Sequence, residues 1–413
     1  MSEAKAKMAS ENLRAALDIG TTRIVALVGE ADEEGRMYVI GHGEAAAEGL
    51  KRGVVVDMEK TVRSIMRAVK DAQMTSATEI DRITVGIAGE HIRSINSHGV
   101  IAVGRSDNEI TRADIRRAVE AARTVAIPVD REIIHVIPQT FSVDDQSGIK
   151  DPIGMAGVRL EVEAHIVTAS ITTARNIYRA LERCHLEVDR MVLESLALSG
   201  ALLTDEETEN GIVMLDIGGD HTNFSVFHEG AIRHTAVIPL GGRNVTNDIA
   251  IGLRCSVDQA ETLKLSHGCA LASMADPAEM LTIPSASAQT PKEISRNVLA
   301  SIIEPRMEEI LSLTFREVKK AAVADMLTGG LVLTGGGALL DGMIQLAEQI
   351  FDTRVRVGEI SQIEHTADEL KDNRFDTAHG LLIHSFQDET VVDNRSSGRG
   401  LLKRFENWIT KRF

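Results

Sequence analysis

One phrase occurs twice in this chain. It reads LDIGTT at residues 17–22 and LDIGGDHT at residues 215–222, and alternating apolar residues follow each copy. Each copy is typical of an apolar strand that ends in a carboxylate, followed by a glycine-containing turn and a return strand, so that the turn presents backbone N–H groups and a hydroxyl at its tip. A single copy is most often an ordinary hairpin. The pair predicts two opposed turns that hold a polyphosphate between them.

A third glycine cluster, LVLTGGGA at residues 331–338, follows another apolar run and precedes a helix-like stretch at residues 340–350. A chain without side chains can lie flat against a base and a ribose, and the N-terminus of a helix adds partial positive charge nearby. This cluster therefore predicts a contact with a nucleoside.

The duplication extends beyond the two turns, because each is followed by strand, strand and helix in the same order. The first copy predicts strands at 13–18, 23–30 and 37–45 and a helix that is N-capped near Asp57 and runs to Gln73; the second predicts strands at 211–216, 223–228 and 231–239 and a helix that opens at Gly242. Two similar halves that face each other make a cleft between them.

Punctuation by proline and glycine divides the rest of the chain. The segment from residue 94 to 171 has its own strand signals at 99–103 and 133–143 and a capped helix at 111–124. We therefore expect six parts: a first core lobe (12–93 plus 172–209), an inserted subdomain (94–171), a second core lobe (210–248 plus 328–386), a second inserted subdomain (249–327), a flexible linker (387–400) and a terminal helix (401–413).

The length and composition of the chain exclude several classes of function. The chain has 413 residues, too many for one compact core, and its net charge of −16 argues against nucleic-acid binding. Cys184, Cys255 and Cys269 lack the spacing of a disulfide framework or a zinc site, which predicts reduced thiols. No segment approaches the roughly 20 apolar residues of a transmembrane helix, so we expect a cytosolic protein.

The C-terminal 13 residues form a strongly amphipathic pattern at helical spacing. One face carries Leu401, Leu402, Phe405, Trp408, Ile409 and Phe413, and the basic residues Lys403, Arg404, Lys411 and Arg412 accompany it. A helix docked on the parent core is the alternative. A polar tether followed by an aromatic face with flanking basic residues favours adsorption to an anionic lipid surface, reversibly and more strongly when several copies are linked.

The three glycine-bearing segments, in this order and spacing, resemble the phosphate-1, phosphate-2 and adenosine motifs of the actin/Hsp70/sugar-kinase superfamily. The run IIHVIPQ at 133–139, the run DPIGM at 151–155 and the tail GLLKRF at 400–405 narrow the resemblance to the FtsA family of bacterial cell-division actin homologues. The resemblance implies an α/β, actin-like (ribonuclease H-like) fold with duplicated βββα lobes around a nucleotide cleft and two inserted subdomains.

The resemblance also implies ATP and Mg²⁺ as ligands. Asp18 and Asp216 would hold Mg²⁺ through its water shell, although a strand-end carboxylate that accepts turn hydrogen bonds is the alternative. The residues implied to contact the nucleotide are Gly20, Thr21, Thr22, Gly218, Gly219, Glu261, Lys264, Gly335, Gly336 and Gly337. An exposed ion pair on a helix is the alternative for Glu261 and Lys264. Glu194 lies where the superfamily places the residue that orients a hydrolytic water.

Two departures from the superfamily pattern bear on catalysis. Ser195 replaces the proline that is common after the glutamate, and Asp220 and His221 replace a Gly-Thr pair in the second phosphate turn. An aspartate can adopt the left-handed conformation of a glycine, but its charge would repel a phosphate. We therefore expect at most a weak ATPase in which the nucleotide is mainly a conformational ligand.

The implied function is a scaffold that polymerises head to tail on the inner membrane at the division septum, tethers the FtsZ ring and recruits later division proteins. The acidic C-terminal peptide of FtsZ would bind a helix in the run 294–306, with Arg296 and Arg306 pairing its carboxylates; solvated surface arginines are the alternative. A small-molecule kinase and a pilus-assembly ATPase of the same superfamily are the rival functions. The kinase would need a substrate base beside the phosphates, and the sequence offers no convincing one.

Overall fold

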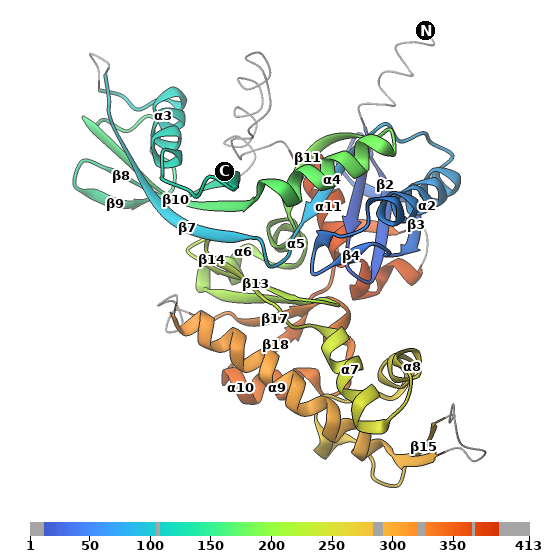
Figure 1. The fold of residues 1–413 in the computed structure, drawn as a ribbon. Helices are drawn as coiled ribbons and strands as arrows, with labels where there is room; N and C mark the ends of the chain where they lie inside the picture. Colours follow the sequence, from blue (N-terminus) through green and yellow to red (C-terminus); the bar gives the residue numbers. More distant parts are fainter. Residues whose placement is uncertain (1–11, 105–107, 284–291, 321–326, 366–367, 388–413) are drawn as a thin grey trace.

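The computed structural model describes residues 12–104, 108–283, 292–320, 327–365 and 368–387. Two sheet-centred lobes are joined side to side, and a separate sheet with one helix extends from the first lobe (Figure 1). The predicted linker (387–400), apart from its first residue, and the predicted terminal helix (401–413) lie outside the described residues. Among the helices of the described ranges, none is both long and apolar enough to cross a membrane.

The first lobe is built on a six-stranded sheet. Its strands, in sheet order, are β11 (Glu187–Leu193), β6 (Arg82–Ile87), β1 (Leu13–Ile19), β2 (Arg23–Ala31), β3 (Met37–Ala46) and β19 (Ile363–His365). β1, β2 and β3 are antiparallel neighbours, whereas β6 runs parallel to β1. β1 ends at the first of the two repeated turns, where Ile19 pairs with Ile24 and the four residues between them reverse the chain.

Helices cover both faces of this sheet. α2 (Met58–Ser76) and α4 (Ile171–Arg183) bury their apolar stripes on one face, and α5 (Glu194–Leu202) and α11 (Asp376–Phe386) pack on the other face, toward the second lobe. The Asp57 carboxylate caps α2 by accepting from the Lys60 N–H at 3.1 Å. α2 crosses β3 closely at Gly43, where a Cβ would lie 2.0 Å from the Ala68 carbonyl oxygen.

The second lobe repeats the pattern around a five-stranded sheet. Its strands, in sheet order, are β14 (Ala231–Ile238), β13 (Thr222–His228), β12 (Ile212–Ile217), β17 (Gly330–Thr334) and β18 (Val355–Val357). Its helices are α7 (Gly242–Leu253), α8 (Val257–His267), α9 (Arg296–Lys320) and α10 (Met343–Phe351), with the hairpin β15 (Met280–Ile283) and β16 (Lys292–Ser295) beyond them. One continuous apolar core joins this sheet to these helices.

The extension from the first lobe is a four-stranded sheet with one helix on it. Its strands, in sheet order, are β7 (Arg93–Ala102), β10 (Arg159–Ser170), β8 (Arg131–Val143) and β9 (Gln146–Ile149), and the helix is α3 (Arg112–Arg123). Its sheet also contacts β14 of the second lobe: the Gln139 amide donates to the Ile232 carbonyl at 2.5 Å and the Ser94 hydroxyl donates to the Thr235 carbonyl at 2.9 Å. The extension, which continues from the first lobe along the chain, is thus also bonded to the second lobe.

Short elements complete the fold. They are β4 (Leu50–Lys51), β5 (Val54–Val55), α6 (Asp205–Asn210), and the 3₁₀ turns η1 (Ala272–Met274), η3 (Gly336–Leu339), η4 (Asp368–Lys371) and η5 (Asn373–Phe375).

The predicted duplication of strand, strand, strand and helix is confirmed as β1-β2-β3-α2 and β12-β13-β14-α7. Two details differ from the sequence expectation. The helix expected from residue 340 begins at Met343, because the glycine cluster first forms the 3₁₀ turn η3. Residues 363–365 and 376–386, both assigned to the second lobe, form β19 beside β3 and α11 on the sheet of the first lobe. The chain therefore crosses back to the first lobe before it enters α11.

Candidate functional site

The structure brings the two repeated turns into direct contact. The backbone N–H of Asp220 donates to the Thr21 hydroxyl at 3.2 Å. A Cβ on Gly219 would lie 2.4 Å from the Thr22 methyl group, so only glycine allows this approach. The tips predicted to face each other do face each other, and a polyphosphate between them would replace these contacts.

Three carboxylates lie at the base of the two turns. Asp18 is the last residue but one of β1, Asp216 lies at the equivalent place on β12, and Glu194 is the first residue of α5; all three are buried. Burial and the neighbouring charge of Asp216 raise the pKa of Asp18 to about 7, with Arg23 opposing. Burial and the charges of Asp18 and Asp216 raise the pKa of Glu194 well above its usual range. The three carboxylates therefore repel one another when they are ionised.

Two further residues beside Asp216 carried no motif in the sequence. The Asn223 amide donates to the Asp216 carboxylate at 3.0 Å and partly offsets the burial that raises the Asp216 pKa. Asp376, the first residue of α11, accepts from the Thr334 hydroxyl at 2.5 Å, and burial raises its pKa to about 7. Asn223 directly follows the repeated phrase and could have been noticed. Asp376, in contrast, lies 160 positions after Asp216 in the chain.

The carboxylate cluster fits a hydrated cation. Among the described residues, no three His, Cys, Asp or Glu side chains converge closely enough to hold a metal ion directly. Mg²⁺ keeps several of its waters and commonly takes one or two carboxylates together with substrate phosphates. Positive charge beside Asp18 and Asp216 would relieve the repulsion that Asp216 exerts on Asp18 and would favour the ionised form of both buried carboxylates.

The third glycine cluster lies directly beside the second turn. Gly335 has φ of 78°, and a Cβ there would lie 2.3 Å from the Asp216 carboxylate; a Cβ on Gly337 would lie 2.2 Å from the Ile217 side chain. Glycine is therefore required at both positions for this loop to pack on β12. The loop predicted to border a nucleoside and the second phosphate turn are thus parts of one surface.

Glu261 and Lys264 lie on α8 and form the ion pair that was the alternative interpretation, at 2.8 Å. The Lys264 ammonium also donates to the Thr246 hydroxyl at 2.8 Å and to the Gly242 carbonyl at 3.2 Å. Gly242 in turn donates its N–H to the Gly218 carbonyl at 2.9 Å. The pair therefore lies close to the second phosphate turn, through the first turn of α7.

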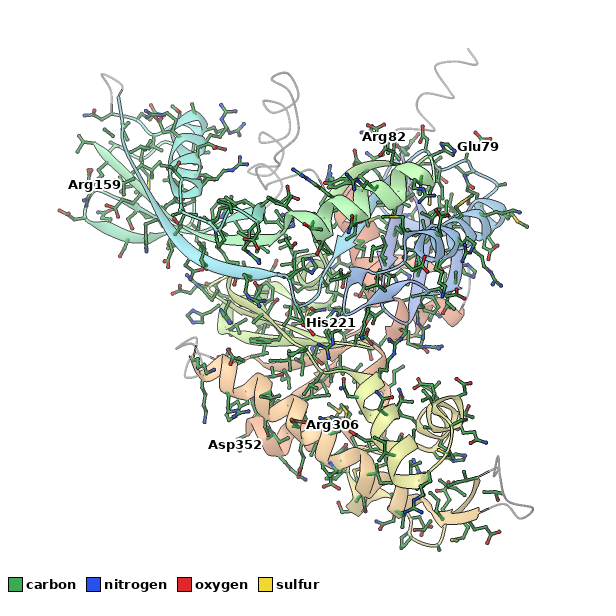
Figure 2. All side chains as sticks on the ribbon, in the orientation of Figure 1. Glu79, Arg82, Arg159, His221, Arg306 and Asp352 are labelled. Atoms are coloured by element: carbon green, nitrogen blue, oxygen red, sulfur yellow. The ribbon has the colours of Figure 1, made fainter. Side chains whose placement is uncertain are left out.

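Asp220 is not among the residues with positive φ, so it does not adopt the left-handed conformation that an aspartate can take in such a turn. Its side chain points between the lobes, where it accepts from the Arg52 N–H at 2.9 Å and pairs with the Arg243 guanidinium at 2.9 Å. Figure 2 shows the adjacent His221 at the junction of the lobes. Burial lowers the pKa of His221 to about 4, so it is neutral at pH 7. Neither Arg52 nor Arg243 was singled out from the sequence.

The two arginines chosen for a partner peptide lie on α9, apart from this cluster (Figure 2 labels Arg306). Both already have partners within the chain. Arg306 pairs with Asp248 at 2.6 Å and also with Glu309, and Arg296 pairs with Glu279 at 3.4 Å and with Asp341. A peptide carboxylate would therefore share or replace these partners.

A surface pocket of about 390 Å³ lies elsewhere, at the C-terminal end of α2. It is lined by Lys70, Met74, Glu79 and His185, among others. It includes no residue that the sequence singled out.

Most of the chain resembles solved structures that have the same architecture. The PilM–PilN type IV pilus biogenesis complex matches at a TM-score of 0.67 and 15% identity, over 90% of this chain and 98% of that chain. MreB5 of Spiroplasma citri bound to ADP matches at a TM-score of 0.57 and 13% identity, over 90% and 95%. At these identities the likeness shows the fold, which is actin-like as expected.

Sequence relatives are much closer. The family model of cell division protein FtsA matches residues 213–380, and the model of the SHS2 domain inserted in FtsA matches residues 89–168. Cell division protein FtsA of Pseudomonas aeruginosa is 41% identical over 99% of this chain and 100% of its own length. That of Neisseria meningitidis is 39% identical over 96% and 98%. A likeness of this degree over nearly the full length shows that the chain belongs to the FtsA family of cell-division proteins.

Proposed function

We propose that the chain binds Mg²⁺ and ATP between its two lobes, polymerises head to tail on the inner membrane, and tethers the FtsZ ring there while recruiting later division proteins. The observation that supports this most strongly is the meeting of both repeated turns, the glycine loop and a buried carboxylate cluster at one place between the lobes. Such convergence from distant parts of the chain is typical of a ligand site.

The proposed role of the nucleotide is conformational. Gly20, Thr21 and Thr22 from the first lobe and Gly218 and Gly219 from the second would bind phosphates, with Gly335, Gly336 and Gly337 beside the adenosine. A bound Mg²⁺ would supply charge neutralisation between Asp18, Asp216 and the phosphates. Because the turns belong to different lobes, occupancy between them changes the separation of the lobes, and a filament contact can select one separation.

Turnover should be slow. Glu194 is the proposed residue for orienting a water, but burial and two neighbouring carboxylates raise its pKa, which disfavours its ionised form. A protonated carboxyl cannot accept the proton of an attacking water. Glu261 and Lys264, which are already paired with each other, are proposed as ribose and adenine contacts.

The membrane part of the proposal is tested by vesicle flotation. A chain truncated after Ser397 is expected to lose binding to vesicles that contain anionic lipid, because it lacks the apolar face and the basic residues of 401–413. The full-length chain should float, less so as the anionic lipid fraction falls. Trp408→Ala, which shortens the apolar face without changing charge, serves as a second variant, and Val129→Ala, at a fully exposed valine on the extension, is the matched control. Flotation that does not depend on the tail would contradict the tether.

The partner site on α9 is tested with neutral substitutions. Arg296→Gln together with Arg306→Gln is expected to weaken binding of the acidic C-terminal peptide of FtsZ by about tenfold or more in fluorescence anisotropy, since both charge-assisted contacts are lost. Lys320→Gln, at the far end of the same helix, is the control. Thermal melts must accompany the measurement, because Arg306 also pairs with Asp248 inside the protein. An unchanged affinity in a folded double variant would reject the assignment.

A further inference from the structure

Asp220 holds together three segments that come from both lobes. Its carboxylate accepts the Arg52 N–H at 2.9 Å from the turn between β4 and β5 of the first lobe, and it pairs at 2.9 Å with Arg243 in the first turn of α7. Its own N–H donates to Thr21 at 3.2 Å. The Asp220 side chain is only 6% exposed. One buried carboxylate thus lies at the centre of the contact between the two phosphate turns.

The groups around this carboxylate are those of an anion site. The donors are the Arg243 guanidinium, at the N-terminus of a helix, and the Arg52 backbone N–H. Proteins use such donors to bind phosphate as readily as carboxylate. Arg243 is also bonded to the first phosphate turn, because its guanidinium donates to the Thr21 carbonyl at 3.1 Å. Its side chain is 44% exposed, so it can be reached from outside while Asp220 cannot.

We infer that Arg243 is a phosphate-binding residue for the terminal phosphate of a nucleoside triphosphate, and that the Asp220 carboxylate is an internal anion that competes for it. This inference rests on the proposed nucleotide site. A polyphosphate between the turns would break the bonds from Asp220 and Arg243 to Thr21, and the guanidinium would then face both the phosphate and Asp220.

The competition affects the triphosphate more than the diphosphate. ATP carries one phosphate and about one negative charge more than ADP at neutral pH, and this additional charge is the one that must share Arg243 with Asp220. Like charges that share one cation repel each other strongly in a partly dry site. Asp220 therefore weakens ATP binding more than ADP binding and so reduces the ratio of the two affinities. This reduction is the consequence of an aspartate in place of the glycine in this turn.

The test compares the dissociation constants of Mg·ATP and Mg·ADP, measured by titration calorimetry on the full-length chain. Asp220→Asn keeps the shape and an acceptor for the Arg52 N–H but removes the charge. It is expected to tighten ATP binding about five- to tenfold and to change ADP binding less than twofold. Arg243→Gln is expected to weaken ATP binding by a similar factor. In the double variant the gain from Asp220→Asn should be smaller than in the unaltered background, since part of it acts through Arg243.

Arg316→Gln, at an exposed arginine of α9, is the matched control and should leave both constants unchanged. Weaker binding of both nucleotides by Asp220→Asn would show that Asp220 only clamps the lobes, and equal tightening of both would remove the terminal phosphate from the assignment; either result overturns the inference. If the unaltered chain and every variant bind neither nucleotide, the proposed function fails as well. If the unaltered chain binds ATP and Arg243→Gln binds it equally, the inference alone fails.

Discussion

Asp216→Asn is expected to raise the melting temperature of the protein in EDTA and, at the same time, to weaken Mg·ATP binding by about 10- to 100-fold. The two effects have opposite signs because they concern the same charge. Asp216 is buried and raises the pKa values of Asp18 and Glu194, so its removal relieves repulsion in the folded state. A cation held through its water shell loses a carboxylate, and outer-shell partners of metals contribute about this factor to affinity.

Melting curves and titration calorimetry on the same samples measure both quantities. The matched control is Asp145→Asn, which removes a carboxylate whose side chain is fully exposed on the extension, and it should change neither. A lower melting temperature combined with unchanged Mg·ATP binding would mean that Asp216 is a structural residue that accepts hydrogen bonds at a strand end. That was the alternative interpretation of this aspartate.

The fold was largely predictable because the duplication is visible in the sequence. Each lobe repeats one order of elements, and the helices have clear starting signals, such as Asp57 before α2 and Thr111 before α3. Pairings between distant segments were not predictable. No local pattern at 363–365 distinguishes a strand that joins β3 of the first sheet from one that stays in the second. Three residues are too few to carry a period.

The candidate site shows the same division. The turns and their two aspartates were recognised because their local signature is repeated, and the glycine loop was recognised from its run of three glycines after an apolar strand. Arg243, Asp376 and the N–H of Arg52 have none, since an arginine in the first turn of a helix or a carboxyl at a helix start is ordinary in sequence. Their importance comes from what lies opposite them in the fold, at separations of up to 222 residues along the chain. The charge of Asp220 was expected to face phosphate unopposed, and the structure pairs it with Arg243.

The second large expected effect concerns pH. In EDTA the melting temperature should be highest near pH 6.5 and should fall on both sides. On the acid side the cause is a set of buried histidines whose pKa values burial lowers to about 3 or 4, namely His91, His135, His165, His221 and His384. These rings gain a proton more readily when unfolded, so the folded state binds fewer protons below the unfolded pKa of about 6.5. Acidification therefore favours unfolding.

On the alkaline side the buried carboxylates act in the opposite sense. Asp18 and Asp376 have pKa values of about 7 in the folded protein, above the ordinary value of 3.8, so the folded state binds more protons than the unfolded state between about pH 4 and pH 7. The stability that this provides is present at low pH and is lost as the pH rises through 7. Between pH 4 and 6.5 the histidines and the carboxylates oppose each other, and as the pH rises past 6.5 the histidine contribution ends before that of the carboxylates.

Asp18→Asn separates the contribution of the carboxylates to the pH dependence of the melting temperature from that of the histidines. It should flatten the fall in melting temperature between pH 6.5 and 8.5 by about one or two degrees. It should also steepen the fall below pH 6.5, because Asp18 no longer opposes the histidines there. Millimolar Mg²⁺ added to the unaltered chain should likewise flatten the fall above pH 6.5, since a cation favours the ionised carboxylates. Asp145→Asn again serves as the control. A melting temperature that does not change from pH 6.5 to 8.5 in EDTA would contradict the repulsive cluster, and a flattening by Asp18→Asn that Mg²⁺ cannot reproduce would place the repulsion there but remove the cation from it.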